Sequence, residues 1–184
     1  MSLIKRLATD NELFILSRDE SKHWALKNKF KDMNLKLQVC DIRDKDRLSK
    51  TICRVNPNIV IIAAALKHVD VCELSPEESI ATNLQGVSNV VSSVGEHLAA
   101  LTDLETVLMV STDKACSPIN VYGMCKSISE RIVLEKSRHI ENVKFVATRY
   151  GNVLETRGSI VPLFMHQAKN NQFITVTRED MTRF

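Results

Sequence analysis

The chain has 184 residues, 44% hydrophobic and 26% charged, which is ordinary for a soluble globular domain with a core of its own. Its net charge of +3 is too small to indicate nucleic-acid binding. The longest strongly apolar run, Ile59–Leu66, is too short to span a membrane, and the N-terminus lacks a signal-peptide pattern. Five cysteines without a Cys-x-x-Cys pair indicate neither disulfides nor a metal site. We therefore expect a cytoplasmic protein without a membrane or nucleic-acid partner.

Short apolar runs alternate with segments of helical periodicity along the chain. The predicted strands are Glu12–Ser17, Lys36–Cys40, Asn58–Ala64, Thr106–Ser111 and Val143–Thr148. The predicted helices are Lys22–Lys31, Asp44–Val55, Pro76–Ala100, about Asn120–Ile140 and Ile160–Asn171. Ser75, Pro76 and Glu78 form the start signal of the third helix, in which Ser75 and Glu78 make a capping box. Strict alternation of strand and helix predicts right-handed crossovers, and so an α/β fold with a doubly wound, Rossmann-like parallel sheet.

The Gly-rich turn that normally opens a dinucleotide-binding domain is missing, because no glycine precedes Gly86. Ser2–Thr9 has the character of the helix that follows such a turn. We therefore expect the chain to begin about one strand and one turn late. The missing strand would lie between Glu12–Ser17 and Asn58–Ala64. Each buried backbone group left unpaired costs about 1–3 kcal/mol, so these two strands could instead pair directly and distort the cofactor site.

Polar residues follow every predicted strand directly. In a doubly wound sheet, ligands bind beyond the carboxyl ends of the strands. Packing alone predicts turn residues of no particular chemistry at these ends, so five polar motifs in a row indicate a binding site. The motifs are Ser17–Glu20, Asp41–Asp44, Ala64–His68, Ser111–Lys114 and Arg149–Asn152.

Tyr122 and Lys126 are separated by three residues on a predicted helix, which puts them on one face, one turn apart. A nearby ammonium favours the phenolate and lowers the pKa of a tyrosine from about 10. Such a tyrosine can act as a base toward an alcohol during hydride transfer to a nicotinamide, and the lysine can reach a ribose hydroxyl. The alternative is a buried tyrosine beside a solvated lysine, because this spacing also occurs by chance.

Asp113 and Lys114 supply a second acid–base pair in the loop that leaves the strand Thr106–Ser111. A simple dehydrogenase or epimerase needs only a serine or threonine here. An added acid and base would allow proton removal next to a new ketone and protonation of a departing hydroxyl, which together eliminate water. The alternative is a surface ion pair.

Several motifs occur in one order along nearly the whole chain: Ser17–Glu20, Ala64–Val69, Ser111–Ala115, Pro118–Asn120, Tyr122-x-x-x-Lys126, Arg149–Val153, Arg157–Ser159, Val161–Pro162 and Met181–Phe184. This set resembles the UDP-N-acetylglucosamine 4,6-dehydratases of polysaccharide biosynthesis, in the extended short-chain dehydrogenase/reductase superfamily. The resemblance covers only the middle of the family's sequence, so the chain is expected to be truncated at both ends. It implies a partial NADP-binding domain over 1–150 and the start of a nucleotide-sugar-binding region over 151–184.

The resemblance also implies roles for individual residues. Tyr122 deprotonates the sugar 4-hydroxyl while hydride leaves C4, and Lys126 tunes Tyr122 and binds the ribose. Lys114 removes the C5 proton and Asp113 helps the 6-hydroxyl to leave, although these two roles could be exchanged. Cofactor contacts are implied for Ser17, Arg18, Asp41, Ile42, Ala63, Ala64 and Val153, and substrate contacts for Lys67, Thr112, Asn152, Arg157, Gly158, Ser159 and Pro162. A guanidinium at Arg18 suits a 2′-phosphate and favours NADP over NAD, whereas Asp19 argues the other way.

Two other functions stay open. One is a nucleotide-sugar 4-epimerase of the same fold, against which Asp113 and Lys114 argue. The other is a non-catalytic remnant, or a fragment that depends on a partner chain, as the missing Gly-rich turn suggests. The superfamily resemblance further implies a homo-oligomer for the full-length protein, formed through the helix that carries Tyr122.

Overall fold

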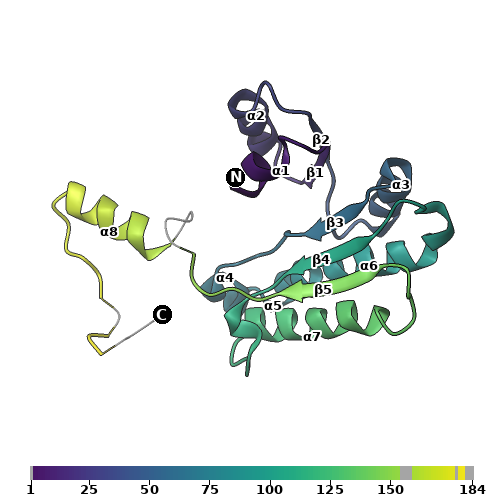
Figure 1. The fold of residues 1–184 in the computed structure, drawn as a ribbon. Coiled ribbons are helices and arrows are strands. Elements are labelled where there is room, and N and C mark those ends of the chain that lie inside the picture. The colour runs from purple at the N-terminus through teal and green to yellow at the C-terminus, as the bar shows by residue number, and fades with distance from the viewer. Residues whose placement is uncertain (1, 154–158, 177, 181–184) are drawn as a thin grey trace. The chain divides into compact units, whose positions relative to one another are not determined.

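The computed structural model describes residues 2–153, 159–176 and 178–180 (Figure 1). It divides into two units, Met1–Thr148 and Arg149–Phe184. The strands are β1 (Leu13–Ser17), β2 (Leu35–Val39), β3 (Ile59–Ile62), β4 (Thr106–Val110) and β5 (Lys144–Thr148). The α-helices are α1 (Ser2–Leu7), α2 (Glu20–Lys29), α3 (Lys45–Val55), α4 (Val69–Leu74), α5 (Pro76–Ser79), α6 (Gly86–Glu96), α7 (Val121–Lys136) and α8 (Ile160–Lys169). All five predicted strands are confirmed within one or two residues at each end.

All the strand pairs are parallel, and they form two sheets, β1-β2 and β3-β4-β5. The registers are regular: Ser17 pairs with Val39, and Val110 pairs with Thr148. Because the paired strands end level with each other, the loops that follow them leave each sheet at one edge. The α/β class with parallel strands and crossover helices is therefore confirmed.

The strands β1 and β3 do not pair in the described part of the chain, so the sheet is not closed by their direct contact. The closure that we considered from the sequence is wrong. Gln38 of β2 donates a hydrogen bond of 3.0 Å to Thr51 of α3. Ile59 of β3 is accordingly 55% exposed, which is unusual for an isoleucine in a strand of a parallel sheet.

Three helices begin at a side chain that caps the first turn. The carboxylate of Asp19 accepts from the Lys22 amide at the start of α2. Asp44 does the same for α3, and the Asn120 side chain accepts from the Gly123 amide in α7. Each cap satisfies a backbone donor that has no partner within its own helix. The loops after β1, β2 and β4 end at these cap residues, and the caps fix where α2, α3 and α7 begin.

The long helix predicted over Pro76–Ala100 is broken into four pieces. The segment η1 (Ile80–Gln85), a π-helical turn, separates α5 from α6, and a 3-10 turn, η2 (Leu98–Ala100), follows. The predicted capping box is wrong, because Ser75 makes no side-chain cap and the Glu78 carboxylate accepts from Arg43 instead. The helix α4 was not predicted.

The core lies between the β3-β4-β5 sheet and the helices α3, α6 and α7. Figure 1 shows α6 and α7 alongside this sheet. In β4, the side chains of Val107 and Met109 are fully buried, and the intervening Leu108 is not. Val146 of β5, in register with Leu108, is 39% exposed. Burial is thus one-sided, although the apolar character of the strands predicts two covered faces.

None of the helices in the described segments combines the length and the apolar character that crossing a bilayer requires. The second unit contains α8, which is joined to the segment after it by hydrogen bonds. The Gln167 side chain donates to Thr175 at 3.0 Å and accepts from the Thr175 amide at 3.3 Å.

Candidate functional site

The loop after β4 carries the predicted acid–base pair in a short 3-10 turn, η3 (Asp113–Ala115). Thr112, at the start of this turn, is buried, and its hydroxyl donates to the Asp113 carboxylate at 2.9 Å. The Lys114 ammonium lies 3.2 Å from the same carboxylate oxygen. The two chemical groups therefore stand in direct contact, as an acid–base couple requires.

Asp113 is a carboxylate at neutral pH. Its partial burial alone would raise its pKa, but the hydrogen bonds from Thr112 and Lys114 and the positive charge of Lys114 together hold the pKa below the ordinary value. The side chain of Asp113 is 42% exposed and that of Lys114 is 24% exposed, so the pair is open on one side. A ligand could reach both groups without any rearrangement of the fold.

The first turn of α7 packs directly on this loop at Gly123. A Cβ atom added to Gly123 would lie 2.2 Å from the carbonyl oxygen of Lys114, a distance that real side chains do not reach. Glycine is therefore required here by close approach of two backbones. Glu73 of α4 also accepts from the Val121 amide at 2.7 Å. The structure thus brings the helix that carries Tyr122 against the Asp113–Lys114 loop.

Tyr122 and Lys126 lie one turn apart on α7, which confirms their predicted placement on one helix. Tyr122 is 8% exposed and Lys126 is 2% exposed. The Lys126 ammonium donates to the carbonyl oxygen of Val110, at the end of β4, at 3.0 Å. Burial lowers the pKa of Lys126 to about 8, against the opposing effect of the Glu130 charge. The solvated lysine of the alternative interpretation is therefore excluded.

Glu130, beside this pair, was not predicted as a site residue. Glu130 is buried, and the Ser111 hydroxyl donates to its carboxylate. The signal was present in the sequence, because Glu130 follows Lys126 by four residues and so shares its helix face.

A buried asparagine in the π-helical turn η1 was also missed, and it holds the loop after β3. The Asn83 side chain accepts from the Leu66 amide at 2.8 Å and donates to the Leu66 carbonyl at 3.0 Å. Its own backbone carbonyl accepts from Ser129 of α7 at 2.8 Å. This chain of contacts fixes the loop that contains three predicted ligand contacts, all exposed: Ala63, Ala64 and Lys67.

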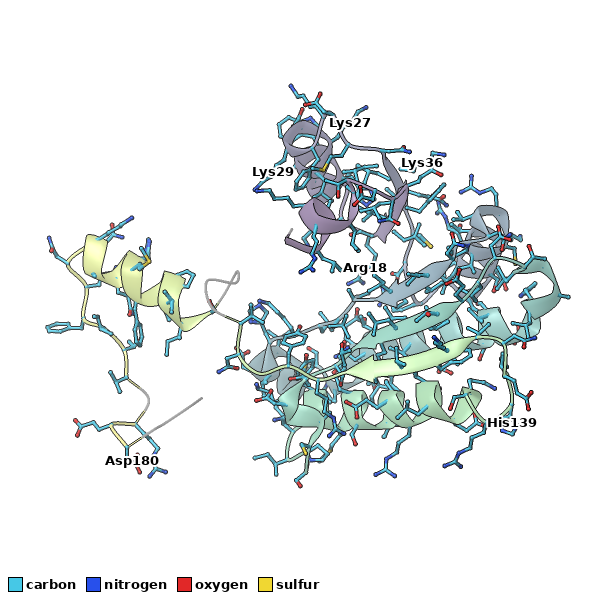
Figure 2. All side chains as sticks on the ribbon, viewed as in Figure 1. Arg18, Lys27, Lys29, Lys36, His139 and Asp180 are labelled. Carbon is cyan, nitrogen blue, oxygen red and sulfur yellow. The ribbon has the colours of Figure 1, made fainter. Side chains whose placement is uncertain are left out.

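The predicted cofactor residues after β1 and β2 form a second cluster (Figure 2, where Arg18 is labelled). The Arg18 guanidinium lies 3.6 Å from the Asp41 carboxylate and 3.7 Å from that of Glu78. Arg43, which the sequence analysis did not single out, contacts the same two acids at 2.7 Å each. Hydrogen bonds from Arg43 lower the pKa of Asp41. Two guanidinium groups therefore meet at this edge.

The loop after β2 is fixed to α6 at Ile42. A Cβ atom added to Gly86 would lie 2.7 Å from the Ile42 side chain. The Asn89 amide donates to the carbonyl oxygens of Ile42 and Arg43, each at 3.1 Å. At the end of β1, the Ser17 hydroxyl accepts from the Asp19 amide at 3.2 Å. The Asp19 carboxylate caps α2 and lies 3.2 Å from the Lys22 ammonium.

The remaining predicted contacts belong to the second unit. Asn152 and Val153 are exposed and follow β5, and Ser159 and Pro162 lie at the start of α8. Arg157 and Gly158 lie outside the described residues. The structure therefore packs the two elements that carry the catalytic candidates, η3 and the first turn of α7, against each other. Separately, it brings the predicted cofactor residues Arg18 and Asp41 together at the ends of β1 and β2.

The family model described as "Polysaccharide biosynthesis protein" matches residues 2–184. A UDP-glucose 4-epimerase of Rickettsia bellii is 38% identical over 175 residues, which cover 94% of this chain and 49% of the relative. The inverting UDP-N-acetylglucosamine 4,6-dehydratase of Campylobacter jejuni is 38% identical over 177 residues, which cover 95% of this chain and 51% of the relative. The chain thus spans about half the length of these curated relatives.

Among solved structures, Pen from Bacillus thuringiensis superimposes with a TM-score of 0.82 at 35% identity, over 91% of this chain and 52% of that one. The UDP-glucose 4-epimerase of Thermotoga maritima, at 16% identity and a TM-score of 0.80, shares the fold over 97% of this chain and 61% of that one. Because the family model matches nearly every residue and curated relatives are 38% identical over 94–95% of the chain, the chain belongs to the family described as "Polysaccharide biosynthesis protein", whose relatives named above are a nucleotide-sugar epimerase and a nucleotide-sugar dehydratase.

Proposed function

We propose that this chain carries the catalytic half of an NADP-dependent nucleotide-sugar 4,6-dehydratase that acts on UDP-N-acetylglucosamine. The observation that carries the proposal is the close approach of Gly123 to the Lys114 carbonyl, which packs the helix of Tyr122 and Lys126 against the loop of Asp113 and Lys114. An epimerase needs one base at C4. A dehydratase needs that base and a second proton-transfer couple for C5 and the 6-hydroxyl, and both sets are present.

In the first step, Tyr122 accepts the proton of the sugar 4-hydroxyl. The buried ammonium of Lys126, one helical turn away, favours the phenolate form of the tyrosine. When bound, NADP supplies the hydride acceptor for C4 and later returns the hydride to C6. Lys126 also supports the ribose in this proposal.

In the second step, Lys114 removes the C5 proton, which the 4-ketone makes acidic, and Asp113 protonates the departing 6-hydroxyl as water. Asp113 starts as a carboxylate, so it must first gain a proton. The contact of 3.2 Å with the Lys114 ammonium provides the route, because one proton transfer yields a neutral amine and a neutral acid. The same pair could act with the two roles exchanged.

The cofactor side of the proposal rests on the ends of β1 and β2. Arg18 and Arg43 provide two guanidinium groups, which suit the 2′-phosphate of NADP. The other proposed contacts on this side of the cofactor are Ser17, Asp41 and Ile42. The proposed contacts on the nicotinamide side are Ala63, Ala64 and Val153. NADP is therefore favoured over NAD.

We also propose how the chain is divided, how the whole enzyme assembles and which residues contact the substrate. Residues 1–150 would bind the cofactor and residues 151–184 would begin the sugar-binding region, with the whole enzyme forming a homo-oligomer in the cytoplasm. The assigned substrate contacts are Lys67, Thr112, Asn152, Arg157, Gly158, Ser159 and Pro162.

The test is product analysis of the purified chain incubated with NADP and UDP-N-acetylglucosamine. Nuclear magnetic resonance and mass spectrometry of the sugar should reveal a 4-keto-6-deoxy product that is 18 Da lighter than the substrate. Recovery of the C4 epimer alone would overturn the dehydratase in favour of an epimerase. Absence of any product would overturn catalysis by this chain alone.

The second candidate is the 4-epimerase, because relatives carrying that name match at the same 38% identity as the dehydratase. Replacing Asp113 with Asn separates the two functions. An epimerase that relies only on Tyr122 and Lys126 keeps its turnover in this variant. A dehydratase loses water elimination, since the couple at C5 and C6 is broken.

A further inference from the structure

Lys126 and Glu130 are the only buried side chains in the described residues that ordinarily carry a full charge. Lys126 is 2% exposed and Glu130 is 5% exposed. Burying a single charge costs several kcal/mol unless an opposite charge or hydrogen bonds compensate. The four-residue spacing on α7 puts the two groups on the same helix face, one turn apart. They are therefore a compensating pair.

Both side chains hold consecutive residues at the end of β4. Lys126 donates to the carbonyl of Val110, and Glu130 accepts from the hydroxyl of Ser111, which is itself 1% exposed. The next residues along the chain are Thr112 and the Asp113–Lys114 pair. The helix α7 thus anchors the strand end from which the proposed proton couple departs.

The charge on Lys126 depends on its surroundings. The elements packed against α7 carry these titratable groups: Asp70, Cys72 and Glu73 on α4, Glu77 and Glu78 on α5, Glu96 on α6, Asp113 and Lys114 on η3, and Lys144 on β5. The charges that act on Lys126 come instead from α7 itself, from Glu130 and Cys125. Burial raises the pKa of the Cys125 thiol, so Cys125 is neutral at physiological pH. Glu130 is thus the source of negative charge that opposes the effect of burial.

We propose that Glu130 is a positioning residue that keeps the Lys126 side chain in its ammonium form and holds the end of β4 in place through Ser111. This inference rests on the proposed function insofar as Lys126 must be charged to favour the Tyr122 phenolate. Without Glu130, the amine of Lys126 would be neutral over most of the physiological range, and Tyr122 would lose the nearby positive charge.

The test is a direct titration of Lys126 in the full chain, which requires no turnover. The lysine side chains are labelled with ¹³C and ¹⁵N, and the Lys126 signal is assigned by its loss in Lys126→Met. In Glu130→Gln, the midpoint should fall from about 8 by roughly 1–3 pH units, the range typical of an opposite charge at close distance. An unchanged midpoint in a folded Glu130→Gln chain would overturn the inference.

Two controls separate charge from structure. Glu135→Gln removes an exposed carboxylate, 48% exposed, from the same helix and should leave the midpoint unchanged. Ser111→Ala removes the hydroxyl donor but keeps the Glu130 charge, so it should move the midpoint far less than Glu130→Gln. Glu130→Asp retains the charge, so its Lys126 midpoint should lie close to that of the unmodified chain. Equal shifts in Glu130→Gln and Glu135→Gln would contradict a specific role.

The unmodified chain offers a measurement that does not depend on any variant folding. Its Lys126 signal should titrate near pH 8, and an amine that is already neutral at pH 7 would overturn the inference. If the Lys126 midpoint falls in Glu130→Gln as expected but no 4-keto product forms, the inference stands and the proposed function fails. If product forms but the Lys126 midpoint does not respond to Glu130, the function stands and the inference fails.

Discussion

The junction of β4 with α7 and the exposed ends of β1 and β2 hold their functional groups in opposite ways. At the junction, Lys126 is 2% exposed and contacts the strand end directly. At the other edge, the side chain of Arg18 is 45% exposed and is held by ion pairs at 3.6 and 3.7 Å. Exposed ion pairs contribute only about 0–1 kcal/mol each. Substitutions at the junction should therefore affect the fold as well as the chemistry, whereas those at the strand ends should affect ligand binding alone.

The largest expected effect is at the proposed base. Tyr122→Phe removes one oxygen atom, so it should lower the rate of 4-keto product formation by roughly 10²–10⁴-fold, the usual contribution of a general base. The rate is measured under saturating NADP and nucleotide sugar, with circular dichroism to verify the fold. A variant that keeps more than a tenth of the rate would contradict the role of Tyr122.

The charge of Lys126 should make stability depend on pH. The pKa of Lys126 is about 8 in the folded chain, below its ordinary value of 10.5. Between these values the unfolded chain holds the proton and the folded chain does not, so the free energy of unfolding should rise with pH, by about 3 kcal/mol in total. Lys126→Met should lack this rise. Urea unfolding from pH 7.5 to 9.5 should capture roughly 2 kcal/mol of this rise, and an equal dependence on pH in both proteins would refute the buried charge.

The close approach at Gly123 should make this position intolerant of a methyl group. Gly123→Ala forces Cβ against the Lys114 carbonyl and should destabilise the chain by about 1–3 kcal/mol in urea unfolding. Gly95→Ala in α6 is the matched control, because no atom lies within 4 Å of the added Cβ. It should be neutral or stabilising by up to about 1 kcal/mol, since alanine favours a helix. Similar costs for both variants would argue against the contact.

The smallest effect on the fold is expected at the strand ends. Arg18→Ala should weaken NADP binding roughly tenfold and leave NAD binding unchanged, because a charge-assisted contact to the 2′-phosphate is lost. Its free energy of unfolding should stay within about 0.5 kcal/mol of the original. Calorimetry with each nucleotide measures the affinities. Lys27→Ala, which removes a positive charge from α2 (Figure 2), is the control. An equal loss for NAD and NADP would remove the argument for the 2′-phosphate.

The strands and the site residues beside them could be predicted because their signals are local. Short β-branched runs such as Ile59–Ile62 predict strands, and the Tyr122–Lys126 spacing predicts a shared helix face. The π-helical turn Ile80–Gln85 could not be predicted, because its backbone is set by contacts of Asn83 with residues distant in sequence. Arg43 was missed for the same reason, since its partner Glu78 is 35 residues away.

The amino-acid order alone determined the α/β alternation and the residue types that could perform proton transfer, because these depend on periodicity and spacing, and its ordered motifs carried the resemblance to the family. Only the tertiary structure decided that β1 and β3 remain unpaired, that Glu78 serves two arginines instead of a helix cap, and that Lys126 is buried beside Glu130. Each of these outcomes depends on a balance of burial and charge between segments that meet only when the chain folds.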